Sequence, residues 1–210
     1  MTRPRLLVAT RSVHKLAELR DLLQLDRGEL VSLDDLGVEG DVDETGSTFE
    51  ANARLKARHA ARLSGLPTLA DDSGLEVDAL GGGPGVRTRR YAGEHATDIE
   101  NNTKLLAALA GLPAERRGAR YVCVLALALP DDAGPRGGLP MRVVRGTCRG
   151  RIAPAPRGTG GFGYDPIFEP ASEPPGGRTL GEWSQAAKNE ISHRGRAARR
   201  IQPILRQLGF

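Results

Sequence analysis

Apolar and polar residues follow one another along the chain in a pattern that predicts strands and helices in turn. The apolar run Arg5–Ala9 is typical of a strand, and leucines three or four positions apart predict a helix over residues 15–25. The string Ser47-Thr48-Phe49-Glu50 matches the capping box, and Gly65 is a typical helix stop. We therefore expect a second helix over residues 48–64.

The rest of the chain continues this alternation. A short buried strand over residues 68–70 is expected to end where Ser73 and Gly74 introduce a turn. The polar loop 130–140 separates two apolar runs, which we expect to form a long hairpin that extends the sheet. The further expected elements are a helix over residues 98–109, strands over 121–129, 141–148 and 167–169, and a C-terminal helix from residue 184 that breaks near residues 193–195.

Length and composition are those of a globular protein. The 210 residues are 39% hydrophobic and 27% charged, and this length suits one domain over residues 1–210 made of two lobes that share a core. The longest apolar run, residues 121–129, is too short to span a bilayer, and no apolar signal segment precedes the first strand. Two cysteines, Cys123 and Cys148, make no disulfide framework. We expect a cytoplasmic protein that has no membrane partner.

The charge balance allows several kinds of partner. Thirty basic and 26 acidic residues give a net charge of +4, which would suit a nucleic-acid-binding protein. Arginines are scattered along the chain, however, and aromatic residues make up only 4% of it, too few for platforms on which single strands stack. A positive site for a small polyanion fits these numbers at least as well, and we expect no nucleic-acid partner.

Two adjacent acids, Asp71 and Asp72, are the most informative polar residues. They follow an apolar run at the expected end of a strand, where α/β proteins build their sites. Paired carboxylates can hold Mg²⁺ and orient a water molecule. An Asx turn with a solvated acid beside it explains the same two residues. The residues by themselves leave both interpretations open.

Four other segments carry candidate chemistry, and the first two also have a simpler explanation. Residues 10–15 place hydroxyls and a lysine where a strand passes into a helix, which suits phosphate binding or an ordinary N-cap. Glu44 precedes a helix that carries Lys56, and a capping acid would look the same. Residues 160–166 hold two aromatic rings in a glycine loop, which favours a stacking role over a core role. Residues 188–195 bring three hydrogen-bond donors together.

Taken together, these segments resemble one family: the Ham1/RdgB-like inosine triphosphate pyrophosphatases, or dITP/XTP diphosphatases. The resemblance runs over residues 6–200, and its most specific strings are ADDSGL at residues 70–75, GFGYDPIF at 161–168 and SHRG at 192–195. It implies an α/β fold: an elongated mixed β-sheet with flanking helices, whose two lobes enclose a nucleotide cleft. It also implies a homodimer.

The family pattern implies a role for each matching residue. Thr10, Ser12 and Lys15 match its phosphate-binding loop, and Lys56 matches a further phosphate contact. Glu44 and Asp72 match its Mg²⁺ ligands, and Asp72 also matches the proton acceptor. The residues that match substrate contacts, mostly of the base and ribose pocket, are Ser73, Phe162, Gly163, Tyr164, Asp165, Lys188, His193 and Arg194. The chain departs from the pattern at Ser12, where the family usually has asparagine, and at His14, where a small residue is common.

The implied reaction is hydrolysis of dITP, ITP or XTP to the monophosphate and pyrophosphate. Phe162 and Tyr164 would stack on the purine, and His193 or Arg194 would donate to the carbonyl at C6, where adenine carries an amino group instead. Two other functions remain open. A nucleotide-sensing module would need no paired acids, and a nucleic-acid-binding protein would show strongly salt-dependent affinity.

Overall fold

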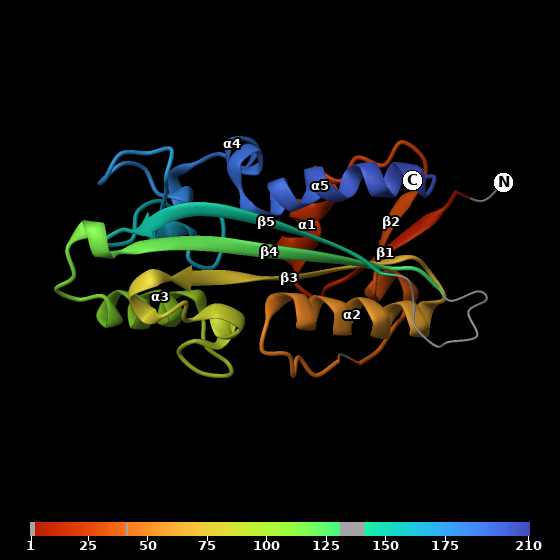
Figure 1. Cartoon of the computed structure of the whole chain (residues 1–210), viewed down its shortest axis with the longest axis horizontal. Helices are drawn as coiled ribbons and strands as arrows, with labels where there is room; N and C mark the ends of the chain where they lie inside the picture. The colour runs from red at the N-terminus through yellow and green to blue at the C-terminus, as the bar shows by residue number, and fades with distance from the viewer. Residues whose placement is uncertain (1–2, 41, 131–140) are drawn as a thin grey trace. The chain divides into compact units, whose positions relative to one another are not determined.

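The computed structural model, which describes residues 3–40, 42–130 and 141–210, contains a mixed sheet in the order β2-β1-β3-β4-β5-β6 (Figure 1). Strand β1 runs parallel to both β2 and β3, whereas β5 and β6 are antiparallel. The strands are β1 Arg5–Ala9, β2 Glu29–Ser32, β3 Thr68–Val77, β4 Gly118–Ala128, β5 Met141–Ile152 and β6 Phe168–Pro170. The prediction of a mixed α/β sheet with flanking helices is confirmed.

Five α-helices accompany these strands in the described part of the chain. They are α1 Val13–Leu22, α2 Phe49–Ser64, α3 Asp98–Ala108, α4 Gln185–Ile191 and α5 His193–Gln207. The predicted break near residue 193 is confirmed, because Ser192 caps the end of α4 in an extended conformation and α5 starts at the next residue. Among these helices, none is long and apolar enough to cross a membrane.

Helix α2 begins one residue later than the capping box predicts. Thr48 is the N-cap, and its side chain accepts a hydrogen bond from the backbone N–H of Ala51. Glu50 therefore lies inside the first turn, where it pairs with Arg54 at 2.8 Å and does not complete a capping box. The end of the helix is as expected, since Gly65 adopts the left-handed conformation that favours glycine.

Strand β3 is longer than predicted. The turn that Ser73 and Gly74 were expected to form does not occur, and the strand runs without interruption from Thr68 to Val77. Leu75 and Val77 beyond the glycine are fully buried, so burial of apolar side chains favours continuation of the strand. The two acids therefore lie in the middle of a strand, and the strand-end prediction is wrong.

The chain divides into two compact units. Unit 1 contains Met1–Asp72, Cys123–Gly146 and Arg194–Phe210, and unit 2 contains Ser73–Val122 and Thr147–His193. Strands β4 and β5 are neighbours in the sheet, as predicted, but nearly all of the loop predicted between them lies outside the described residues.

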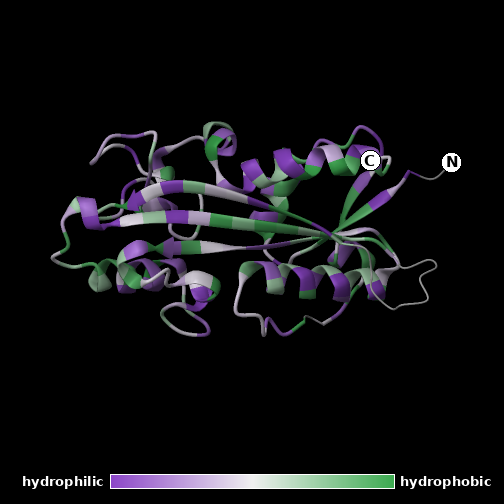
Figure 2. Cartoon of the chain, in the orientation of Figure 1, coloured by the Kyte–Doolittle hydropathy of each residue, from purple (hydrophilic) through white to green (hydrophobic). Residues whose placement is uncertain are grey.

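Unit 1 has apolar layers on both faces of its part of the sheet. Helices α1 and α5 cover one face and α2 covers the other (Figure 1). The α1–α5 side is packed mainly with leucines, including Leu19, Leu125 and Leu205, whereas α2 presents small alanines to the sheet. Figure 2 shows polar and apolar residues alternating along α2 and α5, as expected for helices with one buried face.

Unit 2 has its own core. Leu105 and Leu109 of α3 and its C-terminal end pack with Tyr121, Phe168 and Leu180, all of them buried. Arg117 is also buried, and its guanidinium donates to three backbone carbonyls, those of Leu109, Ile152 and Ala153. The segments that carry candidate site residues of unit 2 are attached to this core.

Candidate active site

The adjacent acids of β3 belong to two different ionic groups. Successive side chains of a strand point to opposite faces, and both acids are buried, with Asp71 1% and Asp72 6% exposed. Asp72 contacts Lys56 of α2. Asp71 contacts Lys15 of α1 and Arg194 of α5, the helices on the other face. The strand thus supplies one carboxylate to each side of the sheet within unit 1.

Lys56 joins the two predicted metal ligands. Its Nζ lies 2.8 Å from Asp72 Oδ1 and 3.1 Å from Glu44 Oε1. The segment that carries Glu44 is held against α2 by Gly46, whose N–H donates to Asn52 Oδ1 at 2.8 Å. A Cβ at Gly46 would lie only 2.5 Å from that oxygen, so the close approach requires glycine. The structure therefore brings together the side chains of Glu44, Lys56 and Asp72.

The charges in this group shift one another's protonation. Burial raises the pKa of the Asp72 carboxyl, and Lys56 and Lys15 lower it by less. Burial lowers the pKa of Lys56, but Asp72 and Glu44 outweigh that effect and raise it overall. Lys56 is therefore firmly cationic, whereas Asp72 is a stronger base than an ordinary aspartate.

One oxygen of Asp72 is available to a ligand. Oδ2 is buried and accepts no hydrogen bond from the described residues, while Oδ1 is occupied by Lys56. Glu44 is the second carboxylate close to the same lysine. No cluster of three or more metal-binding side chains occurs among the described residues. Two carboxylates with one orphaned oxygen fit Mg²⁺, which usually binds through one or two carboxylates together with substrate phosphates.

Asp71 is held by a second, more deeply buried set of charges. Its Oδ2 accepts from Arg194 Nε at 2.9 Å and from the Cys123 thiol at 3.1 Å, and its Oδ1 lies 2.8 Å from Lys15 Nζ. Arg194 also pairs with Glu18 of α1. Burial alone would raise the pKa of Asp71, but Arg194 and Lys15 outweigh it and hold that pKa well below the ordinary value. Asp71 is thus a permanently ionised anchor for Lys15.

The predicted phosphate loop links β1 to α1. Ser12 is the N-cap of α1 and accepts from the backbone N–H of Lys15 at 3.4 Å, while Thr10 Oγ1 accepts from the N–H of Ser12 at 3.2 Å. Arg11 turns away to Asp34 at 2.6 Å. The first turn of α1 contains no acid, so its N-terminus suits an anion.

Asp165 organises the glycine loop of unit 2. One carboxylate oxygen, Oδ2, accepts from the backbone N–H of Phe162 at 3.0 Å and from Lys188 Nζ at 2.7 Å. Gly161 approaches it so closely that a Cβ there would lie 2.1 Å from the same oxygen. Asp165 and Lys188 are both 2% exposed. Lys188 also lies 4.9 Å from the centroid of the Phe162 ring, a cation–π contact that fixes the half-buried ring.

Helix α3 and the segment before it hold the same loop from another side. Asp98 Oδ2 accepts from the N–H of Gly163 at 2.7 Å, and Asn102 Nδ2 donates to the Gly163 carbonyl at 3.1 Å. The Tyr164 hydroxyl donates to the carbonyl of Thr88 at 2.7 Å. These contacts join residues far apart in the sequence, and they make the loop a fixed structure.

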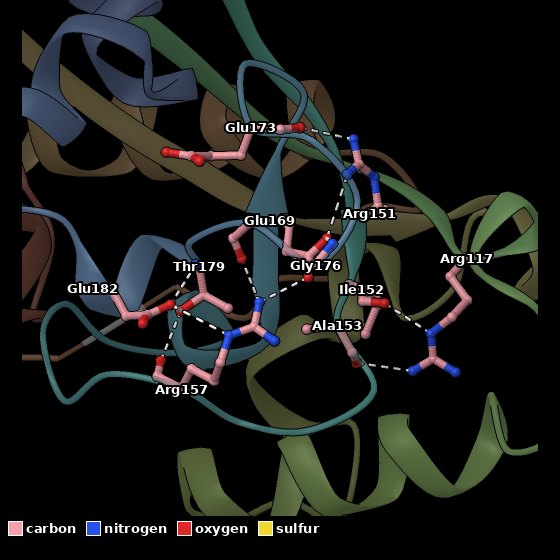
Figure 3. A network of polar contacts seen from close by, with 11 residues as sticks. Arg117, Arg151, Ile152, Ala153, Arg157, Glu169, Glu173, Gly176, Thr179 and Glu182 are labelled. Atoms are coloured by element: carbon pink, nitrogen blue, oxygen red, sulfur yellow. Dashed lines mark hydrogen bonds and ion pairs between the residues drawn. The ribbon is translucent and has the colours of Figure 1, made fainter.

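An arginine network fixes the chain that leads into the glycine loop (Figure 3). Arg157 donates to Glu169 at 2.8 Å and to Glu182 at 3.4 Å, and Arg151 donates to Glu169 at 3.4 Å. Glu169 is only 1% exposed. Thr179 adds a hydrogen bond to the Arg157 carbonyl at 2.7 Å. The segment that leads into the glycine loop is thus anchored by the ion pairs of Arg157.

Tyr164 and Arg194 are placed differently from the roles expected for them. The Tyr164 ring is 4% exposed and packs in the core of unit 2, so it is a core ring and not a free stacking ring. Phe162, which is half-buried, is the ring of this loop that can stack on a base. Arg194 is 1% exposed, and its guanidinium is engaged with Asp71 and Glu18.

The remaining predicted site residues are Ser73 and His193. Ser73 follows Asp72 in β3 and is half-buried. His193 is 5% exposed, and its ring stacks on Tyr121. Sequence reasoning missed the residues that position these groups, namely Glu18, Thr88, Asp98, Asn102, Tyr121 and Arg157. Only Asp98 carried a local signal, as an acid in the first turn of a predicted helix.

Known proteins resemble the chain over nearly its whole length. The family model described as Ham1 family matches residues 6–204. A relative from Nocardia farcinica named dITP/XTP pyrophosphatase is 49% identical, and the match covers 99% of this chain and 98% of the relative. The solved structure of a HAM1 protein from Coxiella burnetii has a TM-score of 0.83 at 42% identity and covers 97% of this chain and 99% of that one. A dITP/XTP pyrophosphatase structure from Mycobacterium abscessus has a TM-score of 0.74 at 45% identity, covering 95% and 99%. The chain belongs to the Ham1 family.

Proposed function

We propose that this protein hydrolyses the non-canonical purine nucleoside triphosphates dITP, ITP and XTP to the nucleoside monophosphate and pyrophosphate. Such a reaction removes deaminated purine nucleotides from the precursor pool. The observation that carries the proposal is the Glu44–Lys56–Asp72 group, which combines a cation for phosphate with a buried carboxylate oxygen that has no partner among the described residues.

Two lysines and two hydroxyl groups bind the triphosphate. Lys15, anchored by Asp71, and Lys56 neutralise its charge, while Thr10 and Ser12 present hydroxyls beside the N-terminus of α1. Mg²⁺ held by Glu44 and Asp72 would polarise the phosphoanhydride when bound. Asp72 accepts the proton of the water that attacks the α-phosphorus, because burial has already made its carboxylate more basic.

An aromatic ring and a histidine contact the purine base. The half-buried Phe162 ring stacks on the purine, and Lys188 and Asp165 hold that ring and its loop in place. His193 donates to the O6 acceptor of hypoxanthine or xanthine. Adenine presents an amino donor at this position, so ATP is rejected.

The test is to incubate purified protein with ITP or ATP and Mg²⁺ and to measure pyrophosphate release. Rapid release from ITP and slow release from ATP are expected. Binding of ITP without turnover would indicate a nucleotide sensor instead. Binding to single-stranded or duplex DNA with an affinity that falls steeply with salt, again without turnover, would indicate a nucleic-acid-binding protein.

The assembly and location expected from the sequence are part of the same proposal. We propose a homodimer in the cytoplasm, where the buried thiols of Cys123 and Cys148 stay reduced. Sedimentation velocity tests the dimer, since a single monomeric species at micromolar concentration would contradict it. Cell fractionation tests the location.

A further inference from the structure

Tyr121 links two segments that the proposed function assigns to the purine base. It lies on β4 in unit 2 and is 7% exposed. Its ring is parallel to the imidazole of His193, with an interplanar angle of 8° and a centroid distance of 4.6 Å. On the side of the core it packs against Phe168 at 4.7 Å.

The hydroxyl of Tyr121 is equally engaged. The charge of the Asp165 carboxylate acts on this hydroxyl and favours its protonated, donating form. Burial, followed by the charge of Asp165, raises the pKa of Tyr121 well above the ordinary value, so the phenol keeps its proton and remains a donor. One side chain therefore interacts with Asp165 of the glycine loop through its hydroxyl and stacks on His193 through its ring.

We propose that Tyr121 is a positioning residue for base selectivity: it sets the plane of the His193 ring and the position of the Phe162–Asp165 loop relative to one another. The inference rests on the proposed function. The N–H groups of an imidazole donate in the plane of the ring, so a ring stacked at this angle has a fixed direction of donation. Selectivity for O6 over an amino group depends on that direction, because a misaligned donor loses most of its hydrogen bond.

The carboxylate of Asp165 transmits the effect to the stacking ring. It accepts hydrogen bonds from Lys188 and from the N–H of Phe162, and its charge acts on the Tyr121 hydroxyl. Removing one donor leaves a buried charge less well satisfied, which permits the loop to shift. Both contacts to the base, stacking from Phe162 and hydrogen bonding from His193, then lose precision together.

Two substitutions separate the contributions of Tyr121. Tyr121→Phe keeps the ring stacked on His193 but removes the hydroxyl from Asp165. Tyr121→Leu removes the stacking as well. Tyr91→Phe is the matched control, because it removes the hydroxyl of another unit 2 tyrosine that has no assigned role in the site.

The measurement is kcat and KM for ITP and for ATP in each variant, with folding checked by circular dichroism. For Tyr121→Phe we expect KM for ITP to rise about tenfold, the fold-change of a lost hydrogen bond to a charged group, while kcat and the ATP parameters change little. Tyr121→Leu should lower the ITP-to-ATP ratio of kcat/KM a further two- to tenfold, as for a lost aromatic pair. Tyr91→Phe should leave the ratio unchanged.

The outcomes distinguish this inference from the proposed function. If the wild type releases no pyrophosphate from ITP, the proposed function is wrong. If the wild type prefers ITP and folded Tyr121→Phe keeps the same ITP-to-ATP ratio, the positioning role is wrong. Equal losses on both nucleotides would also overturn it, since they indicate a purely structural residue. Should Tyr121→Leu fail to fold, Tyr121→Phe alone decides the question.

Discussion

Removing the positive charge of Arg194 should destabilise the protein strongly. The side chain is 1% exposed, and it pairs with Asp71 and with Glu18, which are 1% and 5% exposed. Substitution by methionine keeps an unbranched apolar side chain of comparable reach but leaves two buried carboxylates without this partner.

The contacts in the structure set the magnitude. Breaking a buried ion pair by removing one partner costs about 3–5 kcal/mol. Asp71 keeps Lys15 at 2.8 Å and the Cys123 thiol at 3.1 Å, so we expect the lower end of that range, about 3 kcal/mol. Because a protein of this size loses roughly 2–4 °C in Tm for each kcal/mol, the melting temperature should fall by about 6–12 °C.

Urea unfolding at neutral pH measures this loss, with the midpoint and slope fitted for wild type and Arg194→Met. Arg206→Met is the matched control, because Arg206 pairs with Asp26 at 3.2 Å on the surface, where both side chains are more than half exposed. It should cost no more than about 1 kcal/mol. Adding Glu18→Gln to Arg194→Met should recover part of the loss, since it removes one uncompensated charge.

The pH dependence provides a second check on Arg194→Met. The lowered pKa of Asp71 gives stability that is present above the unfolded pKa, about 3.9, and that is lost as the pH falls through the lower folded value. The difference in stability between wild type and variant should therefore shrink below about pH 4. A loss under 1 kcal/mol, combined with a selective loss of activity on ITP, would refute this reasoning and return Arg194 to the base pocket.

Four further predictions concern the site directly. Asp72→Asn should lower kcat by at least about 10²–10⁴-fold and leave nucleotide binding largely intact, and turnover within a few-fold of wild type would remove Asp72 from the mechanism. In the wild type, because burial raises the pKa of Asp72, kcat/KM should fall in acid at a pH above the ordinary aspartate value of about 3.9, and a limb at or below that value would count against its role as base. Ser12→Asn should change KM for ITP by no more than about tenfold and leave base preference alone, so a shifted ITP-to-ATP ratio would show that this loop does not face the phosphates. Phe162→Leu should raise KM for ITP by about 5–150-fold, because base stacking is lost. Tyr164→Phe should lower the free energy of unfolding by about 1 kcal/mol and leave KM nearly unchanged. The reverse pattern would make Tyr164 the stacking ring.

Much of the fold follows from local sequence signals. Strand β1 was predicted with its observed bounds, and α2 and α3 were predicted to within about one residue, because leucine spacing and terminal glycines act over a few residues. The same local reasoning failed at β3. Ser73 and Gly74 have turn-forming propensities, but the burial of Leu75 and Val77 outweighs them and keeps the strand extended.

Some features of the candidate site could likewise be inferred from the sequence, and others could not. The resemblance to the family already implied phosphate and metal roles for Glu44, Lys56 and Asp72, and the structure brings these three side chains together. The burial of Tyr164 could not be inferred, because an aromatic ring in a glycine loop can face a ligand or the core, and only the position of α3 and its neighbours decides which.

The sequence by itself determined the order of elements, the mixed α/β class and the identity of the chemical groups, because these depend on residue type and on spacing within a few positions. Only the tertiary structure decided that Asp71 and Asp72 form ion pairs on opposite faces of the sheet. It also decided that Arg194 is the partner of Asp71 and that Tyr121 stacks on His193. Each of these pairings joins residues far apart in the chain or depends on which side of the sheet a helix covers. Such contacts are set by the packing of whole elements, since a charge can be buried without a large free-energy cost only where the rest of the fold supplies its partner.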